Sequence, residues 1–313
     1  MAIYSESKIN SIQLAEEMAS ELDKGVVHAA VTGMFRDSAT EAMFKGANTV
    51  YIPEIDMDGL GDYDKDEGYP RGGVSISYRP YTLTMDRGRK FNIDAMDVEE
   101  SGIPRLLGDK MALFESRKVL PELDAYTLSK LGNHAVTSGQ TIGVTTSIKD
   151  DVYDIFADMQ SQIGDNLDFN QELVCFVDST VWSALSKSEK FSKMITISDF
   201  KRGGINTRVK SIDDVPIIRV PSSRMFTAYD YKDGKSTDQA TGGFTPAADA
   251  QKIGMLMLPK DACMQVVKHK LSKIYTPNEV RDLDAYQINY RMYYDALILN
   301  SLKTGIFAYT YAQ

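Results

Sequence analysis

The sequence has few of the residues on which redox, metal and nucleophilic sites depend. Its 313 residues include two cysteines, three histidines and one tryptophan. Cys175 and Cys263 stand alone, without a CxxC spacing, so they form neither a disulfide framework nor a zinc site. No histidine lies near a GxSxG, HExxH or similar motif. We therefore expect no enzymatic activity, no bound metal and no cofactor.

Long hydrophobic runs are also missing. No apolar stretch approaches the ~20 residues that a membrane-spanning helix needs. The N-terminal segment lacks the basic start and the apolar core of a signal peptide. Because 43% of the residues are apolar and 25% are charged, the composition is that of a folded globular protein and not of a disordered chain. We expect no membrane partner.

Positive charge is in the minority and is unevenly distributed. The formal net charge of −9 argues against nucleic-acid binding through bulk charge. One segment carries a net charge of −6, from Glu54, Asp56, Asp58, Asp62, Asp64, Asp66 and Glu67 against Lys65. The stretch that follows carries +4, from Arg71, Arg79, Arg87, Arg89 and Lys90 against Asp86. An acidic segment is thus followed at once by a basic one.

Residues 48–93 predict a long two-stranded ribbon. Residues 48–56 have the β-branched and aromatic composition of a strand. Residues 74–85 alternate, with Val74, Ile76 and Tyr78 on one face, and the alternation can be followed as far as Ile93. The glycine-rich loop 57–73 between them is longer than an ordinary hairpin connection. We expect no third strand nearby, so the ribbon needs another surface to lie on.

The acidic loop matches a calcium-binding EF-hand only in part. With Asp56 as position 1 of the motif, Leu60 takes position 5, where a ligand is required. Strands and not helices are expected on either side of the loop. A solvated charged loop is the favoured interpretation, and weak cation binding is the alternative.

The rest of the chain predicts an α+β protein. Residues 1–24 have the spacing of an amphipathic helix, and residues 94–132 that of a long helix, bent at Pro104 and Pro121 and closed by Gly132. An α/β unit follows, with a helix at 148–163, another around Trp182, a loop or hairpin at 201–210, a polar loop at 230–252, and buried strands at 173–179, 215–221 and 253–259. Long tyrosine-rich strands are expected at 264–277 and 285–300, and a last strand at 305–311. A ribbon and a helical arm without a local core favour a self-assembling subunit.

Three stretches resemble the major capsid proteins of tailed bacteriophages: NTVYIPEIDMDGLGDYD, VSISYRPYTLTMDRGRKFNIDAMDVEES and DAYQINYRMYYDALILNSLKTGIFAYTY. The resemblance covers essentially the whole chain and is most specific from Tyr81 to Tyr126 and from Lys260 onward. It implies an HK97-like capsid fold. In that fold 1–46 is the N-arm, 47–93 the E-loop, 94–139 the spine helix of the P-domain, 140–262 the A-domain, 263–300 the P-domain strands, and 301–313 the last A-domain strand.

The resemblance also implies a function. It implies a shell protein that assembles into hexamers and pentamers of an icosahedral phage head around double-stranded DNA, in the virion and, during assembly, in the host cytoplasm. Its partners are expected to be further copies, a portal and, since only about 47 residues precede the ribbon, a separate scaffolding protein. The DNA is enclosed without sequence-specific binding. Lys65 is a formal candidate for the Lys–Asn cross-link of some relatives, but no asparagine and glutamate partners can be named, so we expect non-covalent assembly.

We expect three sets of residues to make the assembly contacts. The apolar sets are Ile9, Ile12 and Leu22 in the arm, and Val74, Ile76 and Tyr78 in the ribbon. The charged set is Asp62, Asp64, Asp66, Glu67, Arg71, Arg79, Arg87, Arg89 and Lys90, which would select neighbour and register. Two alternatives stay open, an encapsulin-like compartment around a protein cargo and a soluble α/β hydrolase or binding protein.

Overall fold

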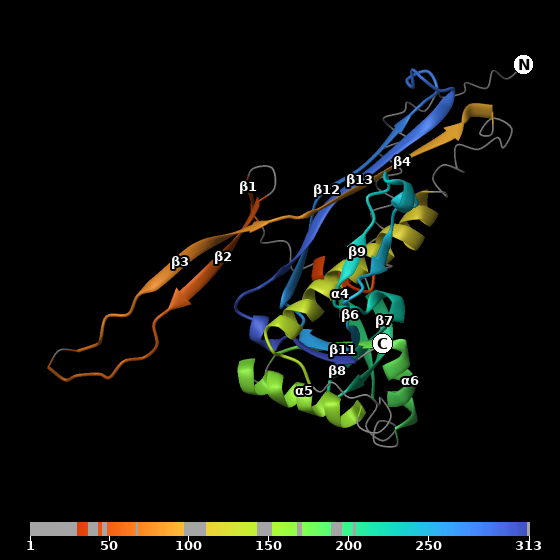
Figure 1. The fold of residues 1–313 in the computed structure, drawn as a ribbon. Helices are drawn as coiled ribbons and strands as arrows, with labels where there is room; N and C mark the ends of the chain where they lie inside the picture. Colours follow the sequence, from red (N-terminus) through yellow and green to blue (C-terminus); the bar gives the residue numbers. More distant parts are fainter. Residues whose placement is uncertain are drawn as a thin grey trace, which may run out of the picture.

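A computed structural model shows one long ribbon that projects from the body of the molecule (Figure 1). The structure describes residues 30–36, 43–45, 49–66, 68–96, 111–142, 152–167, 171–188, 196–202 and 205–311. The body combines a three-stranded sheet, a long helix and a six-stranded sheet. Within these residues no helix is both long and apolar enough to cross a membrane.

The ribbon is made of antiparallel strands β2 (Thr49–Met57) and β3 (Val74–Thr82), as the alternation predicts. The expectation that no third strand lies nearby is wrong, because β1 (Met43–Lys45) pairs with β2 and gives the order β1-β2-β3. The ribbon is also shorter than predicted. Strand β3 ends at Thr82, and the chain passes into a different sheet after Leu83 and Thr84.

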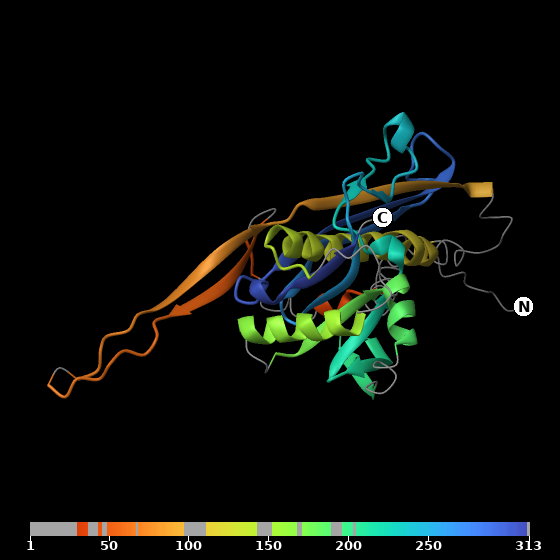
Figure 2. The same cartoon turned by 60° about the horizontal axis from the view of Figure 1, so that its bottom comes forward.

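That second sheet has the order β12-β13-β4, all antiparallel. Its strands are β4 (Met85–Asp94), β12 (Cys263–Tyr275) and β13 (Ala285–Ile298). Alternate residues of β13, Ile288, Tyr290, Met292 and Tyr294, are buried in a cluster with Met111 and Leu123 of the long helix. Tyr290 and Tyr294 thus pack inside the subunit. The long strands lie along the helix in Figure 2.

The long helix ends later than its sequence predicts, and the residues 97–110, with the predicted bend at Pro104, lie outside the described residues. The described helix starts at Met111, passes through a π-helical turn η2 (Glu115–Val119), and continues as α4 (Leu120–Thr137). Pro121 comes just after this π-helical turn, and the helix continues through it. Gly132 does not close the helix. Gly132 lies inside α4, where an added Cβ would overlap Cδ1 of Ile253. Close packing therefore explains this glycine, and a helix end does not.

The α/β unit contains a six-stranded sheet of order β14-β11-β5-β8-β7-β6. Its strands are β5 (Leu173–Asp178), β6 (Thr196–Arg202), β7 (Ile205–Ile212), β8 (Val215–Val220), β11 (Lys252–Pro259) and β14 (Phe307–Tyr311). Helices α5 (Val152–Leu167) and α6 (Ser179–Lys187) pack on it. The predicted buried strands are confirmed. Where a loop or hairpin was expected at 201–210, the structure has the hairpin β6–β7, which begins earlier, at Thr196. The expected polar loop 230–252 carries a small two-stranded sheet, β9 (Tyr229–Tyr231) with β10 (Phe244–Pro246).

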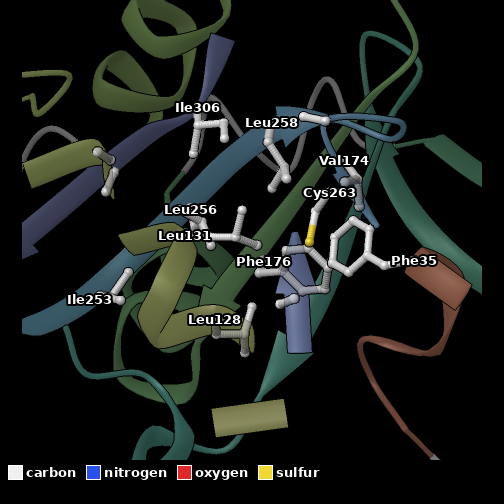
Figure 3. Close-up of a cluster of buried hydrophobic side chains, with 14 of the residues drawn as sticks. Phe35, Leu128, Leu131, Val174, Phe176, Ile253, Leu256, Leu258, Cys263 and Ile306 are labelled. Carbon is white, nitrogen blue, oxygen red and sulfur yellow. The ribbon is translucent and has the colours of Figure 1, made fainter. Parts of the chain in front are cut away.

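Helix α4 contributes to two hydrophobic cores, that of the α/β unit and that under the sheet β12-β13-β4. Leu128 and Leu131 of α4 lie beside Phe176 of β5 and Leu256 of β11 in Figure 3, and all four side chains are fully buried. The preceding turns of the same helix cover the sheet β12-β13-β4. The chain is therefore a mixed α+β fold joined along α4.

Candidate assembly surfaces

The ribbon presents an apolar face that nothing in the described part of its own chain covers. Val74, Ile76 and Tyr78 are 68%, 63% and 54% exposed. Because residues of a strand two positions apart lie on one face, these side chains form a row along β3. Met57 pairs directly with Val74 and is 67% exposed. Of the ten large hydrophobic residues that are most exposed among the described residues, seven lie on the ribbon and its tip, so this is where we expect a partner.

The acidic tip of the ribbon has an organisation of its own. Asp64 and Gly68 exchange backbone hydrogen bonds, and the N–H of Asp66 donates to the Asp64 carboxylate at 2.6 Å. The rings of Tyr63 and Tyr69 contact each other with centroids 5.0 Å apart. Predicted contact residues Asp62, Asp64, Asp66 and Arg71 are exposed here, and Glu67 lies outside the described residues, as do Ile9, Ile12 and Leu22.

The root of the ribbon is held by one buried carboxylate. Asp295 of β13 is 1% exposed and accepts four hydrogen bonds from outside its own strand. The N–H and hydroxyl of Thr84 donate to Oδ2 at 3.0 Å each, and the Tyr126 hydroxyl and Lys130 Nζ donate to Oδ1 at 2.7 and 2.6 Å. Burial raises the pKa of Tyr126, so its phenol stays a donor. The junction between ribbon and body is thus fixed in direction.

Apolar packing supports the same junction. Leu83 is buried with Val50 of β2 and Leu297 of β13, and the Tyr293 hydroxyl donates to the Leu83 carbonyl at 2.8 Å. The near half of the ribbon is therefore part of the body, while its distal half and tip extend into solvent (Figure 1). This combination of a fixed root and an exposed end suits an element that reaches a neighbour.

The basic residues of the predicted contact set divide into two groups. Arg87 and Arg89 of β4 are engaged inside the chain. Arg87 forms an ion pair with Glu122 of α4 at 2.7 Å, and both guanidinium groups donate to backbone carbonyls of the 232–243 loop. Lys90 remains exposed, and Arg79 lies 3.7 Å from Glu54 on the ribbon. Sequence alone does not reveal this difference, because every residue has a backbone carbonyl. No charged residue therefore marks the partners, which lie more than 140 residues away in the chain.

Sequence reasoning missed three buried acids that hold segments together. Asp124 of α4 is fully buried, accepts from the Thr32 N–H and hydroxyl at 3.0 and 2.7 Å, and pairs with Arg224 at 3.0 Å. Asp178 accepts from the Tyr311 hydroxyl at 2.9 Å and so ties β5 to β14. Asp178 ends an otherwise apolar strand, and that pattern was an available signal. Asp124 follows Glu122 in α4, and Asp295 lies in a strand with other polar residues, so the sequence gives no such signal for these two.

The protonation of these acids differs with their surroundings. Burial raises the pKa of Asp124 despite its hydrogen bonds. For Asp178 burial acts in the same direction, but hydrogen bonds from Ser222 and Tyr311 and the charge of Lys252 outweigh it and lower the pKa. Burial also raises the pKa of both cysteine thiols, that of Cys263 to about 12. The cysteines are therefore packed thiols and not nucleophiles.

A hollow in the α/β unit is one place where the enzyme alternative could hold a substrate. A cavity of about 370 Å³ lies between α5, the start of β5 and the β7–β8 turn. Its polar lining is Gln160, Gln171, Glu172, Asp213, Asp214 and Lys260, and Lys260 is bound to Glu172 at 2.8 Å. No serine, cysteine or histidine lines this cavity, so it gives the hydrolase alternative no support.

Comparison with known proteins places the fold. No protein-family model matches the sequence, and no curated protein matches it significantly. Solved structures do match. The capsid of cyanophage P-SCSP1u is 10% identical with a TM-score of 0.56, over 87% of this chain and 85% of that chain. The mature capsid of bacteriophage PhiM1 is 14% identical with a TM-score of 0.54, over 85% and 82%.

A virus-like particle from Pyrococcus furiosus is 8% identical with a TM-score of 0.50, over 94% of this chain and 98% of that chain. At these identities the matches speak for architecture. They cover most of the chain, and they are phage capsid structures in the main. The chain therefore has the HK97-type fold of tailed-phage capsid proteins.

Proposed function

We propose that the chain is a major capsid protein that assembles into hexamers and pentamers of an icosahedral phage shell. The observation that carries this proposal is the exposed apolar face of a ribbon whose root is rigidly held. Burying a side chain such as Val74, Ile76 or Tyr78 on a neighbour contributes about 1.5–3 kcal/mol each. In this proposal β1–β3 form the E-loop, the long strands and α4 the P-domain, and the six-stranded sheet the A-domain.

The proposed shell encloses double-stranded DNA without binding its sequence. A subunit with a net charge of −9 does not hold DNA tightly against the wall, which suits DNA that must be packed and released. A portal and a separate scaffolding protein are the proposed further partners. The subunit catalyses no reaction, assembles in the host cytoplasm and remains in the virion.

An encapsulin-like compartment is the second candidate. The likeness to a virus-like particle, which extends over nearly all of both chains, favours it specifically. Both candidates predict a closed shell built from one chain, and they differ in what the shell contains.

Size-exclusion chromatography and negative-stain microscopy of the expressed full-length chain test the proposal. We expect closed particles of tens of nanometres, and nuclease-protected DNA in particles recovered from phage. A protein cargo in place of DNA supports the compartment. A species that elutes as a single 34.9 kDa chain at all concentrations contradicts both shell proposals.

The acidic tip gives a test of the charged contacts. We propose that Asp62 and Asp66, which extend into solvent, select the neighbour on which the ribbon lies. Replacing both by asparagine is expected to raise the subunit concentration needed for assembly at low salt about two- to ten-fold, and to weaken the salt dependence, because exposed charges are screened. Light scattering against salt concentration measures both.

The matched control removes the same net charge elsewhere. Asp158 on α5 and Asp282 before β13 are exposed and distant from the tip. If Asp158→Asn with Asp282→Asn raises the subunit concentration needed for assembly as much as the tip variant does, overall charge and not the tip is responsible. The proposal that the tip selects the neighbour is then wrong.

A further inference from the structure

The loop of residues 232–243, between β9 and β10, has a shape that its own side chains hold. The carboxylate of Asp233 accepts from the N–H groups of Lys235 and Ser236 at 2.8 and 3.0 Å and from the Ser236 hydroxyl at 2.5 Å. These hydrogen bonds, the one from the Ser236 hydroxyl above all, lower the pKa of Asp233 to about 2, so the carboxylate stays charged. The Asp233 N–H in turn donates to Gln239 at 2.9 Å.

Two arginines of β4 hold this loop by its backbone. Each guanidinium donates to two carbonyl oxygens, and the four bonds are Arg87 to Lys232 (2.8 Å) and Gly243 (3.3 Å), and Arg89 to Ala240 (3.0 Å) and Gly234 (3.5 Å). We call this arrangement the clasp. Because carbonyls and not side chains are bound, the clasp depends on the conformation of the loop. In Figures 1 and 2 the loop that follows β9 lies beside β4.

Glycines make room for the clasp. Gly234 and Gly242 have φ of +70° and +64°, and both lie against the Arg89 guanidinium. An added Cβ would come within 2.7 Å of Nη1 at Gly234 and 3.4 Å at Gly242. Gly243 also has a positive φ, of +86°, but an added Cβ there meets nothing within 4 Å. Gly234 therefore serves the contact with Arg89 as well as the turn.

The clasp adds a contact between two units that already share a buried core, in which α4 and the ends of β12 and β13 pack against β5 and β11. The loop belongs in sequence to the α/β unit, whereas Arg87 lies in the three-stranded sheet and pairs with Glu122 of α4 at 2.7 Å. The Arg87 guanidinium also lies 5.8 Å from the ring centroid of Tyr231, which contacts Tyr126. The residues of the clasp lie outside this buried core, so their four hydrogen bonds attach the loop to β4 at a second place.

We propose that the clasp fixes the orientation of the six-stranded sheet against the long strands, and that Arg87 and Arg89 are positioning residues for the curvature of the shell. The inference rests on the proposed shell function. A shell of identical copies closes at a size set by the shape of each copy, so a subunit whose two units vary in their relative orientation closes at several sizes.

Arg89→Ala tests the clasp in two measurements on the full chain. Hydrogen exchange of the unassembled subunit is expected to be about ten-fold faster in residues 232–243, as for the loss of hydrogen bonds to a charged group. Microscopy of assembled particles is expected to show a broader distribution of diameters. Asn92→Ala, at an exposed position on the same strand, is the control and changes neither.

A pair of glycine variants separates the clasp from general damage to the loop. Gly234→Ala and Gly243→Ala both strain a positive φ, but only the first displaces Arg89. The extra loss of loop protection in Gly234→Ala is expected to vanish when Arg89 is already alanine. An equal effect in both backgrounds overturns the clasp. Faster loop exchange with unchanged particle diameters overturns its role in curvature, whereas a wild-type chain that forms no particles overturns the shell function itself.

Discussion

Replacing Val74, Ile76 and Tyr78 together by threonine is expected to abolish shell formation while the subunit stays folded. Threonine keeps the β-propensity of the strand, and all three positions are more than half exposed, so the free energy of unfolding should change little. Each ribbon loses about 5 kcal/mol of apolar burial on its neighbour, which corresponds to roughly four thousand-fold in the association constant of that contact. Sedimentation velocity measures the loss of particles, and thermal unfolding measures the fold.

The opposite face of the same strand supplies the control. Ser75→Thr with Ser77→Thr changes β3 as conservatively, on the face without the apolar row. This variant should assemble as the wild type does. If the triple variant forms shells at the wild-type concentration, the apolar face is not an assembly contact and the account of the ribbon fails.

Asp295→Asn is expected to have the largest effect on stability. Asparagine keeps the shape of the side chain but presents an NH₂ group to donors and removes the partner of Lys130. Asp295 is almost fully buried, whereas Lys130 is 36% exposed and can regain water. We therefore expect the free energy of unfolding to fall by about 3 kcal/mol. Urea unfolding followed by circular dichroism measures it.

Asp86 provides the comparison for this prediction. It pairs with Arg291 on the exposed face of the same sheet, and both side chains are largely open to solvent. Asp86→Asn should cost less than about 1 kcal/mol. Equal costs for the two variants contradict the assignment of Asp295 as the anchor of the ribbon. Faster exchange at Leu83 and Thr84 in Asp295→Asn would show that the anchor acts at the junction.

Elements with a strong local pattern were predictable from the sequence. The alternation from Val74 to Tyr78 located β3, and the short apolar runs located β5, β8 and β11, because side-chain periodicity depends only on the backbone geometry of one element. The change of sheet at Leu83 was not predictable. Strand β4 continues the alternation of β3 but pairs with β13, about 200 residues away, and periodicity does not identify a pairing partner.

Side chains whose partners are distant were likewise hidden. The run of positive charge that contains Arg87 and Arg89 suggested a contact between subunits, yet their partners are carbonyls within the chain. Gly132 looked like a helix end because glycine often is one, whereas here it makes room for Ile253. In these cases the local sequence fits two structural roles equally well, and the tertiary packing decides between them.

The central claim is that the ribbon of one copy is buried on another copy in a closed shell. Electron cryo-microscopy of particles formed by the wild-type chain tests it most directly. The account predicts that Val74, Ile76 and Tyr78 lose their exposure against a neighbouring subunit. Particles in which the ribbon extends into solvent with these side chains uncovered would contradict it.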